Sequence, residues 1–304
     1  TINHDEWCVD IIKSPLGIVG FVFEGRPNVI ADATGVLKSG NSVVFRVGQD
    51  ALQTANAILE YALYPALDKA TISRNVIRLI NHTEHATAWA LFANKNINLA
   101  VARGSGFSTK LLGNIAQHYG IPTSLHGTGG AWMMTSEHTS EDRLKNAIIG
   151  SLDRKVCNTL NTLCLIKSNY KNHFKTVIDA LNDVEHQLKK SYKIHIEEKS
   201  FELIKPLITN TTITVERSNG NHQEQQIVTI KKHRLGHEWE WEKNPEITVV
   251  IVESIDEAIQ LFNNYSPQFV ASLISENETE QNIFFNQINA PFVGNGMTRW
   301  VDGQ

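Results

Sequence analysis

GIVGFVF, at residues 17–23, is a continuous apolar run that ends at the turn-forming stretch EGRPN, at residues 24–28. A run of this length predicts a strand buried on both faces, and residues 30–37 then predict a helix. The same pairing recurs along the first half of the chain, with strands predicted at residues 42–45, 75–80 and 98–102 and helices at 51–63, 86–92 and 108–118. Because strands alternate with helices, we predict parallel βαβ units and an α/β fold with a doubly wound, Rossmann-type domain.

The second half of the chain predicts another α/β domain. Ser140 is the predicted N-cap of a helix at residues 141–151, and we expect a domain border near it. Residues 169–240 are polar and favour helices, with an amphipathic helix at 170–190 and a surface turn at 219–226. Later strands are predicted at residues 247–252 and 269–274, and helices at 255–263 and 278–287. The predicted division is a cofactor-binding domain at 1–143, a catalytic domain at 144–290 and a return segment toward the cofactor and oligomerisation region at 291–304.

The composition excludes several classes of partner. Hydrophobic residues make up 41% and charged residues 20% of the 304 positions, which is typical of a globular chain of two domains. The 28 basic and 32 acidic residues give a net charge of −4, so no basic surface for nucleic acid or an anionic membrane is expected. No stretch approaches the run of about 18 apolar residues that a membrane helix needs.

Cysteine usage and the two ends of the chain bear on its compartment and its extent. Cys8, Cys157 and Cys164 are too few for a disulfide framework, and the N-terminal stretch lacks a basic region followed by an apolar one. We therefore expect a cytoplasmic protein. The sequence begins with Thr1 and stops in a polar stretch after Val301, so we expect a longer protein with further parts at both ends.

Cys157 is the candidate nucleophile. It follows Arg154 and Lys155, two cations that favour the thiolate, and the thiolate is the nucleophilic form of cysteine. The alternative is a small buried apolar residue, which is what most free cysteines are. Cys164, in the apolar run LCLI, and Cys8, near the start of the chain, fit this alternative better.

Two glycine-bearing turns follow predicted strands. ARGSG at residues 102–106 has the position of a phosphate-tolerant turn but lacks the full GxGxxG spacing. HGTGG at residues 126–130 puts the His126 imidazole beside a flexible turn, where a base or a positioning group is useful. Plain turns and a surface histidine are the alternatives. The chain has no GxxxxGK[ST] motif and no Cys and His spacing of a zinc site, so we expect neither a P-loop nor a structural metal.

These segments together, in order, resemble the γ-glutamyl phosphate reductase family of the aldehyde dehydrogenase superfamily. SPLGIVG followed by FEGRPNV is similar to that family's PLGVIG and YESRPNV, and KSGNSVVFR to its KSGNAVILR. ARGSG looks like its PRGG turn, LHGTG like its EHGVG, and VCN followed by TL like VCNxxETL around the family nucleophile. TRWVDG at residues 298–303 looks like TRFTDG. The matches span almost the whole chain and favour a catalytic Cys157.

The chain also departs from this pattern. Lys155 stands where the family commonly has glycine, and Asn161 stands where it has glutamate. Leu125 replaces an acidic residue and Met297 a serine. These changes bear on the pocket beside the nucleophile, so the substrate is less firmly predicted than the fold.

The resemblance implies NADPH-dependent reduction of L-glutamyl 5-phosphate to L-glutamate 5-semialdehyde, a step of proline formation, through a thioester on Cys157. Asn28, in the RPN segment, looks like the amide that stabilises the oxyanion together with the backbone N–H of Cys157. The alternative role for Asn28 is to satisfy the start of the helix that follows it. NADP is the expected cofactor, with NAD as the alternative.

Further site residues follow from the resemblance and from charge. Arg46 looks like a contact to the cofactor ribose or 2′-phosphate, with a solvated arginine at a strand end as the alternative. The other residues expected to border the cofactor are Gly104, Ser105, Gly106, Gly127 and Gly129. Candidate substrate contacts are Arg26, His126, Arg154 and Asn158. His126 replaces the glutamate that serves as base in hydrolytic aldehyde dehydrogenases, which favours release of the acyl group to phosphate rather than to water.

Two other functions stay open from the sequence. One is another aldehyde dehydrogenase, dependent on phosphate or CoA and acting on a different small substrate. The other is a catalytically inactive homologue that binds a nucleotide or a partner protein. The resemblance also implies a homo-oligomer, a dimer or higher, in which a β-hairpin arm is exchanged between subunits.

Overall fold

The computed structural model describes residues 2–3, 5, 7–23, 29–217, 219–241 and 243–301. The chain forms two compact units, Thr1–Thr128 and Gly129–Gln304. The border lies earlier in the chain than the predicted one at 143/144. The reason is that β8 (Ala131–Thr135) pairs with β9 and β15 of the second unit and not with the sheet of the first unit. None of the described helices is both long and apolar enough to span a membrane.

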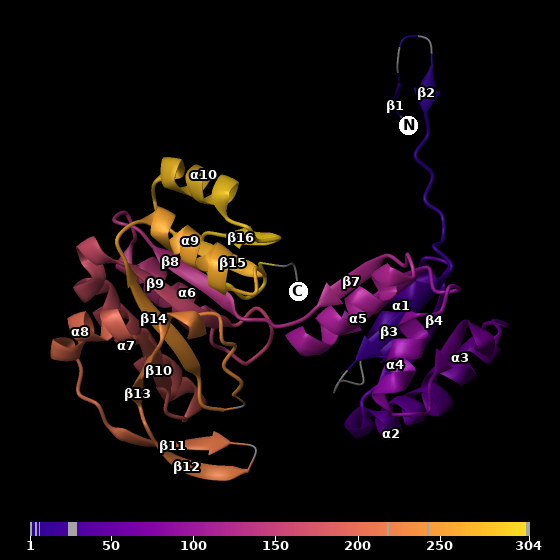
Figure 1. The fold of residues 1–304 in the computed structure, drawn as a ribbon, viewed down its shortest axis with the longest axis horizontal. Coiled ribbons are helices and arrows are strands. Elements are labelled where there is room, and N and C mark those ends of the chain that lie inside the picture. Colours follow the sequence, from indigo (N-terminus) through magenta and orange to yellow (C-terminus); the bar gives the residue numbers. More distant parts are fainter. Residues whose placement is uncertain are drawn as a thin grey trace. The chain divides into compact units, whose positions relative to one another are not determined.

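The described part of the first unit contains a five-stranded parallel sheet with the order β5-β4-β3-β6-β7 (Figure 1). β3, the first strand of this sheet along the chain, lies at its centre, so the strand order reverses between β3 and β6. This is the order of a doubly wound nucleotide-binding sheet, as predicted. The strands are β3 (Ile18–Phe23), β4 (Ser42–Val47), β5 (Ile77–Leu79), β6 (Leu99–Arg103) and β7 (Thr123–His126).

Helices cover both faces of this sheet. On one face, Ala33, Ala51 and Ala55 pack with Phe21 and Phe45 of the strands. On the other face, a second cluster joins side chains of α4 and α5 to Val22 and Ala102. Burial on both faces explains why the strands read as unbroken apolar runs. The helices are α1 (Val29–Lys38), α2 (Gln49–Ile58), α3 (Tyr64–Lys69), α4 (His85–Phe92) and α5 (Gly106–His118).

The described part of the second unit contains a seven-stranded parallel sheet with the order β13-β10-β14-β9-β8-β15-β16 (Figure 1). One apolar cluster packs α6, α7 and α8 on one face, and another packs α9 and α10 on the opposite face. Besides β8, the strands are β9 (Leu160–Ile166), β10 (Lys193–Glu197), β13 (Ile227–Ile230), β14 (Glu246–Val252), β15 (Val270–Ile274) and β16 (Phe292–Gly294). The helices are α6 (Glu141–Gly150), α7 (Tyr170–Leu188), α8 (Glu198–Ile204), α9 (Ile255–Tyr265) and α10 (Glu278–Gln287).

Two β-hairpins lie outside these sheets. The first joins β1 (Ile2–Asn3) to β2 (Cys8–Val9). The second joins β11 (Thr212–Arg217) to β12 (Gly220–Gln225), so the surface turn predicted at 219–226 is wrong and most of that stretch is a strand. Its polar residues misled the prediction because nearly all of β12 is exposed and shows no apolar alternation.

Charged groups tie the β11–β12 hairpin to the seven-stranded sheet. Arg217 donates to both carboxylate oxygens of Glu224, at 2.9 and 2.8 Å, and to Glu246 of β14. Lys193 of β10 also donates to Glu224. The hydrogen bonds from Arg217 lower the pKa of Glu224 to about 2. The hairpin is therefore held to β10 and β14 by ion pairs.

The last segment of the chain packs on the second unit. β16 pairs with β15, and Thr298 and Arg299 bond to residues between α6 and β9. Within the described residues, 291–301 therefore extend the seven-stranded sheet and contact the loop between α6 and β9. The sequence predicts a return segment toward the cofactor and oligomerisation region at 291–304.

A buried histidine in α7 makes the stability of the second unit dependent on pH. His173 is fully buried, and burial lowers its pKa to about 4 from the ordinary value of 6.5. The His173 imidazole is protonated near pH 6.5 in the unfolded chain and only near pH 4 in the folded chain. The contribution of the neutral imidazole to the free energy of unfolding is therefore fully present above pH 6.5. It is lost, by roughly 3 kcal/mol, as the pH falls from 6.5 to 4. Urea unfolding of His173→Gln should depend less on pH between 6.5 and 4 than that of the wild type, and equal dependence would contradict this.

Candidate active site

The first unit gathers its predicted cofactor residues at the carboxyl edge of the sheet. Arg46 lies near the end of β4, and Gly104 to Gly106 follow β6 at the point where the strand order reverses. His126 ends β7 and lies beside Arg103 in the register. In open α/β sheets, ligands bind in the crevice at this edge and at this reversal.

Glycines allow the turns after β6 and β7 to touch. A side chain on Gly106 would overlap the Thr128 hydroxyl, and one on Gly127 would begin 2.7 Å from Thr109 Oγ1 and 3.2 Å from the Gly106 Cα. Gly104 donates its amide to the His126 carbonyl oxygen at 3.2 Å. The two turns predicted to border the cofactor are thus packed against each other.

Ser105 caps the helix that begins at this edge. Its Oγ accepts a hydrogen bond from the Ser108 amide at 3.3 Å, and the helix α5 follows from Gly106. The amides and the positive dipole end of such a helix favour an anion. The sequence predicted Ser105 as a cofactor residue, and its position suits a pyrophosphate.

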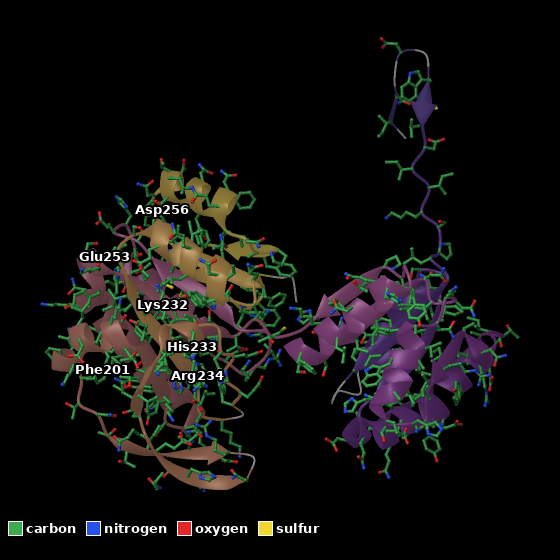
Figure 2. All side chains as sticks on the ribbon, in the orientation of Figure 1. Phe201, Lys232, His233, Arg234, Glu253 and Asp256 are labelled. Carbon is green, nitrogen blue, oxygen red and sulfur yellow. The ribbon has the colours of Figure 1, made fainter. Side chains whose placement is uncertain are left out.

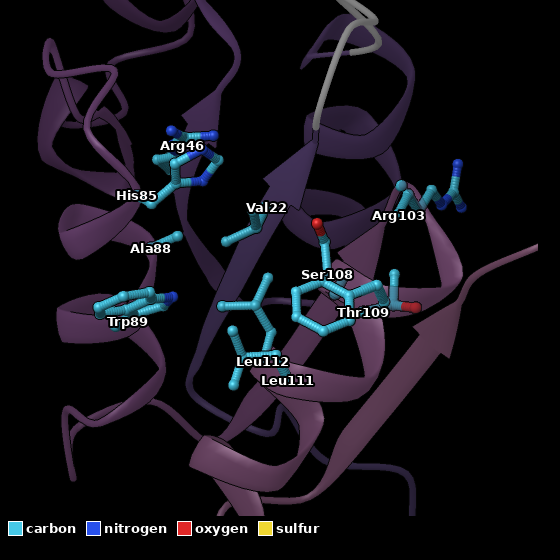
Figure 3. Close-up of a pocket in the computed structure, with 13 residues that line it drawn as sticks. Val22, Arg46, His85, Ala88, Trp89, Arg103, Ser108, Thr109, Leu111 and Leu112 are labelled. Carbon is cyan, nitrogen blue, oxygen red and sulfur yellow. The ribbon is translucent and has the colours of Figure 1, made fainter.

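A cavity of about 260 Å³ opens between α4 and α5 beside these turns (Figure 3). Arg46 and His85 lie at one end, with Trp89 of α4 further along it. Trp89 is 45% exposed and Phe107 81%, although both are large apolar side chains. The cavity is lined by Val22, Arg46, His85, Ala88, Trp89, Ala102, Arg103, Gly104, Phe107, Ser108, Thr109, Leu111 and Leu112.

Arg46 is held in place inside the unit. It is 5% exposed, and its guanidinium donates to the carbonyl oxygen of Thr83. The alternative of a solvated arginine is therefore wrong, because the side chain is buried and lines the cavity. A guanidinium fixed in this way is a preorganised partner for a phosphate.

In the second unit, Cys157 lies in the loop between α6 and β9, which we call the nucleophile loop (residues 151–159). Cys157 is partly exposed. The loop is folded on itself, since Val156 donates its amide to Thr159 Oγ1 at 2.8 Å and that hydroxyl donates to the Arg154 carbonyl at 2.7 Å. Cys157 is therefore presented on an ordered turn at the amino end of β9.

The other two cysteines lie in different surroundings. Cys164 is fully buried in β9, and burial raises the pKa of its thiol. Cys8 is exposed on β2 in the first unit. The alternative role of a small buried apolar residue therefore fits Cys164 and does not fit Cys157.

The end of the chain pins the nucleophile loop from one side. Thr298 donates its amide to Ser151 Oγ and its hydroxyl to the Asn158 carbonyl, both at 2.8 Å. Arg299 is 3% exposed and donates to Asp153 Oδ1 at 2.8 Å and to Asn158 Oδ1. Asn158, a predicted substrate contact, is itself buried with its amide oxygen on Arg299. Arg299 belongs to the TRWVDG motif, and its role in holding this loop depends on contacts with residues more than 140 positions away.

Gly129 and Gly130 lie against the loop from the opposite side. Gly130 donates its amide to the Cys157 carbonyl at 2.8 Å and has a φ of +103°, which a residue with a side chain rarely adopts. A side chain on Gly129 would begin 2.7 Å from both the Cα and the carbonyl oxygen of Cys157. Gly129, predicted to border the cofactor, therefore packs directly on the candidate nucleophile.

A carboxylate that the sequence analysis missed lies at the same point. Glu238 accepts a hydrogen bond from the Gly129 amide at 2.6 Å and from the Lys155 ammonium. Its loop follows the basic stretch Lys232, His233 and Arg234, which Figure 2 labels. Asn161 bonds the backbone on either side of Glu238, donating to the His237 carbonyl and accepting from the Trp239 amide, both at 2.9 Å.

The remaining predicted residues are distributed as follows. Arg26 and Asn28 lie outside the described residues. Arg154 is exposed on the nucleophile loop, and His126 is partly exposed at the end of β7. The described residues contain no group of three or more His, Cys, Asp and Glu side chains that could hold a metal ion.

Curated relatives of known name are similar to the chain over nearly its whole length. The γ-glutamyl phosphate reductase 2 of Bacillus licheniformis is 26% identical over 300 residues, which covers 96% of this chain and 62% of the relative. The γ-glutamyl phosphate reductase of Bacillus subtilis is 25% identical and matches 97% of this chain and 64% of its own. The chain thus spans less than two thirds of these relatives. No family model matches it.

Solved structures show the fold. γ-Glutamyl phosphate reductase from Thermotoga maritima matches 94% of this chain and 62% of its own, with a TM-score of 0.75 and 23% identity. Two more structures each match 95% of this chain and 68% of their own, with a TM-score of 0.67 and 16% identity. These are the propionaldehyde dehydrogenase of Rhodopseudomonas palustris, with bound CoA and an acylated cysteine, and an engineered glycolyl-CoA reductase with bound NADP⁺. The resemblance to γ-glutamyl phosphate reductase is confirmed, and the fold is aldehyde dehydrogenase-like.

Proposed function

We propose that this chain catalyses the NADPH-dependent reduction of L-glutamyl 5-phosphate to L-glutamate 5-semialdehyde, through a thioester on Cys157. The observation that carries the proposal is the nucleophile loop. It presents a partly exposed cysteine and is pinned by Arg299 on one side and by Gly129 and Gly130 on the other. The relatives named γ-glutamyl phosphate reductase support this choice of substrate.

The residues of the first unit fit a dinucleotide. The cavity beside β4 and β6 has room for an adenosine group, with Trp89 and Phe107 as apolar contacts. The Ser105-capped start of α5 suits the pyrophosphate, and buried Arg46 suits a ribose 2′-phosphate. We propose NADP rather than NAD for this reason. A bound NADPH supplies a hydride.

The chemistry of the chain's own groups follows from acyl transfer. The Cys157 thiolate attacks the C5 carbonyl carbon of the acyl phosphate, the carbon–oxygen bond to phosphate breaks, and inorganic phosphate leaves with the electron pair. A thioester remains on the sulfur. After reduction of the acyl carbon, the carbon–sulfur bond of the thiohemiacetal breaks, the sulfur leaves as thiolate and the aldehyde is released.

Each tetrahedral stage puts negative charge on the substrate oxygen. We propose that the backbone N–H of Cys157 and the amide of Asn28 donate to it, and one such donor is typically worth about 3 to 4 kcal/mol. Exposed Arg154, together with Arg26, is the proposed contact for the anionic groups of the substrate. His126 in place of an acidic base favours transfer to phosphate over transfer to water.

Assembly and location are part of the same proposal. We propose a homo-oligomer in which the β11–β12 hairpin contacts a second copy, since this hairpin is held to β14 by an ion pair and is exposed along β12. Cys8, Cys157 and Cys164 are free thiols, which suits a reducing cytoplasm.

The acyl acceptor distinguishes the proposal from its strongest competitor. Glutamate 5-semialdehyde and NADP should give NADPH beyond one equivalent per Cys157 only when phosphate is present, and CoA should not replace phosphate. Turnover is measured at 340 nm with phosphate, with CoA and with neither. A CoA-dependent aldehyde dehydrogenase is the second candidate, because CoA-linked enzymes are among the structural neighbours. Activity with CoA and none with phosphate would favour it.

A further inference from the structure

The ion pair between Lys155 and Glu238 lies directly beside the candidate nucleophile. The point at which a Gly129 side chain would begin is 2.7 Å from the Cys157 Cα and 2.8 Å from Glu238 Oε1. The same Oε1 accepts from the Lys155 ammonium, and the other carboxylate oxygen accepts from the Gly129 amide. One carboxylate thus links the nucleophile loop to Gly129, in the segment that leads into β8.

The pair is shielded from water. The side chain of Lys155 is 10% exposed and that of Glu238 14%. Charges in such surroundings interact several times more strongly than they do in bulk water. Either charge, left without the other, would therefore act on a nearby thiolate.

Asn161 holds the backbone on both sides of Glu238 and so keeps the Glu238 carboxylate beside Lys155. Asn161 is 3% exposed, and its amide holds the backbone of His237 and Trp239, the neighbours of Glu238. Lys155 and Asn161 are two positions at which the sequence departs from the family pattern. In the structure the two departures meet at Glu238, so they form one arrangement rather than two unrelated changes.

We propose that Lys155 and Glu238 act together as positioning residues that hold the Cys157 backbone and balance the charge beside its thiol. The inference rests on the proposed function, because it gives Cys157 the role of nucleophile. The Lys155 ammonium stabilises the Cys157 thiolate and lowers the thiol pKa, whereas the Glu238 carboxylate destabilises the thiolate and raises it. With both charges present, the thiol pKa lies between these two extremes. The hydrogen bond from the Gly129 amide to Glu238 supplies the positioning part.

Among the described residues, the other charged or titratable groups near the nucleophile loop are paired, exposed or neutral. Asp153 is paired with Arg299 at 2.8 Å. Arg154 is exposed on the loop itself. His237 precedes Glu238, and burial lowers its pKa, so it is neutral near pH 7. Substitution of Lys155 or Glu238 should therefore change the charge beside the Cys157 thiol more than substitution of these other groups would.

The test measures the pKa of the Cys157 thiol from the pH dependence of iodoacetamide alkylation, followed on the Cys157 peptide by mass spectrometry. Lys155→Met leaves the carboxylate uncompensated and should raise the thiol pKa by about half a unit or more. Glu238→Gln keeps an acceptor for the Gly129 amide, leaves the ammonium uncompensated and should lower the pKa by a similar amount. The double variant should return close to the wild type.

The controls use an exposed pair of the same unit, Lys167 and Glu253, whose charged atoms lie 2.5 Å apart. Lys167→Met and Glu253→Gln should leave the thiol pKa unchanged. Shifts of the same sign in Lys155→Met and Glu238→Gln, no shift in either, or an equal shift in the controls would overturn the proposal. Should Glu238→Gln fail to fold, Lys155→Met alone decides it.

The same variants separate this inference from the proposed function. Thiol pKa values are read without substrate, so opposite shifts support the pair even in a protein that fails the phosphate test. Where activity is present, Glu238→Ala, which also removes the acceptor of the Gly129 amide, should lower kcat more than Glu238→Gln does. Equal kcat values in these two variants would overturn the positioning part.

Discussion

Cys157→Ala should abolish phosphate-dependent formation of NADPH from glutamate 5-semialdehyde, with a loss in kcat on the order of 10⁴-fold or more. Alanine cannot form a thioester, and without the thioester the acyl group has no covalent route to phosphate. The measurement is steady-state turnover of the variant beside the wild type at equal folded concentration.

Two further cysteines serve as controls for this prediction. Cys8→Ser removes an exposed thiol of the first unit and should keep full activity. Cys164→Ala alters a fully buried position of β9 and should affect stability more than kcat. A Cys157→Ala protein that retains a tenth of the wild-type rate would show that this residue is not the nucleophile.

Gly129→Ala should have the next largest effect. Its new methyl group would begin 2.7 Å from the Cys157 Cα and carbonyl oxygen and 2.8 Å from Glu238 Oε1. Contacts this short force the nucleophile loop to move, and a displacement of about 1 Å in a catalytic group lowers rates roughly 10²-fold. Overpacking should also lower the free energy of unfolding by about 1 to 3 kcal/mol. Both effects are measured on one preparation, by kinetics and by urea unfolding.

Gly35→Ala is the matched control for that substitution. Gly35 lies in α1, and nothing lies within 4 Å of the place its side chain would occupy. Alanine there should leave kcat unchanged and stabilise the helix by about 0.5 to 1 kcal/mol. Wild-type kcat in a folded Gly129→Ala protein would mean that the nucleophile loop does not depend on this close approach.

The fold was predictable because most strands are buried on both faces. The apolar runs at 17–23 and 98–102 became β3 and β6, and the helix expected at 278–287 is α10 with the same bounds. Ser140 caps α6 as expected, accepting from the Arg143 amide at 3.4 Å. In these segments periodicity, caps and turn residues all point to one structure.

One strand that the sequence did not predict, β10, contains buried polar and charged residues. β10 reads KIHIE, and its polar residues resemble the exposed face of a loop or a helix. In the structure Lys193, His195 and Glu197 are all buried. Lys193 pairs with Glu224, His195 bonds Glu246 at 2.8 Å, and Glu197 caps α8. The partners of Lys193 and His195 come from distant segments, so a local pattern cannot reveal that these two side chains are buried.

Some residues of the candidate site are also predictable from local sequence and others are not. Cys157 and the glycine turns have local signals, and in the structure Cys157 lies on an ordered loop and the turns after β6 and β7 lie at the sheet edge. Glu238 lies 83 residues from Lys155, in a stretch whose local pattern singles out none of its acidic residues. Only tertiary contacts identify it, just as they identify Arg299 as the residue that holds Asp153 and Asn158.

The most direct test of the central claim is to detect the acyl group on Cys157. The protein is incubated with glutamate 5-semialdehyde and NADP without phosphate, and intact and peptide masses are recorded before and after phosphate is added. We expect one glutamyl adduct on the Cys157 peptide, absent in Cys157→Ala and released by phosphate. Phosphate-dependent NADPH formation by a protein whose Cys157 carries no adduct when phosphate is withheld, or an adduct that phosphate cannot release, would contradict a thioester on Cys157.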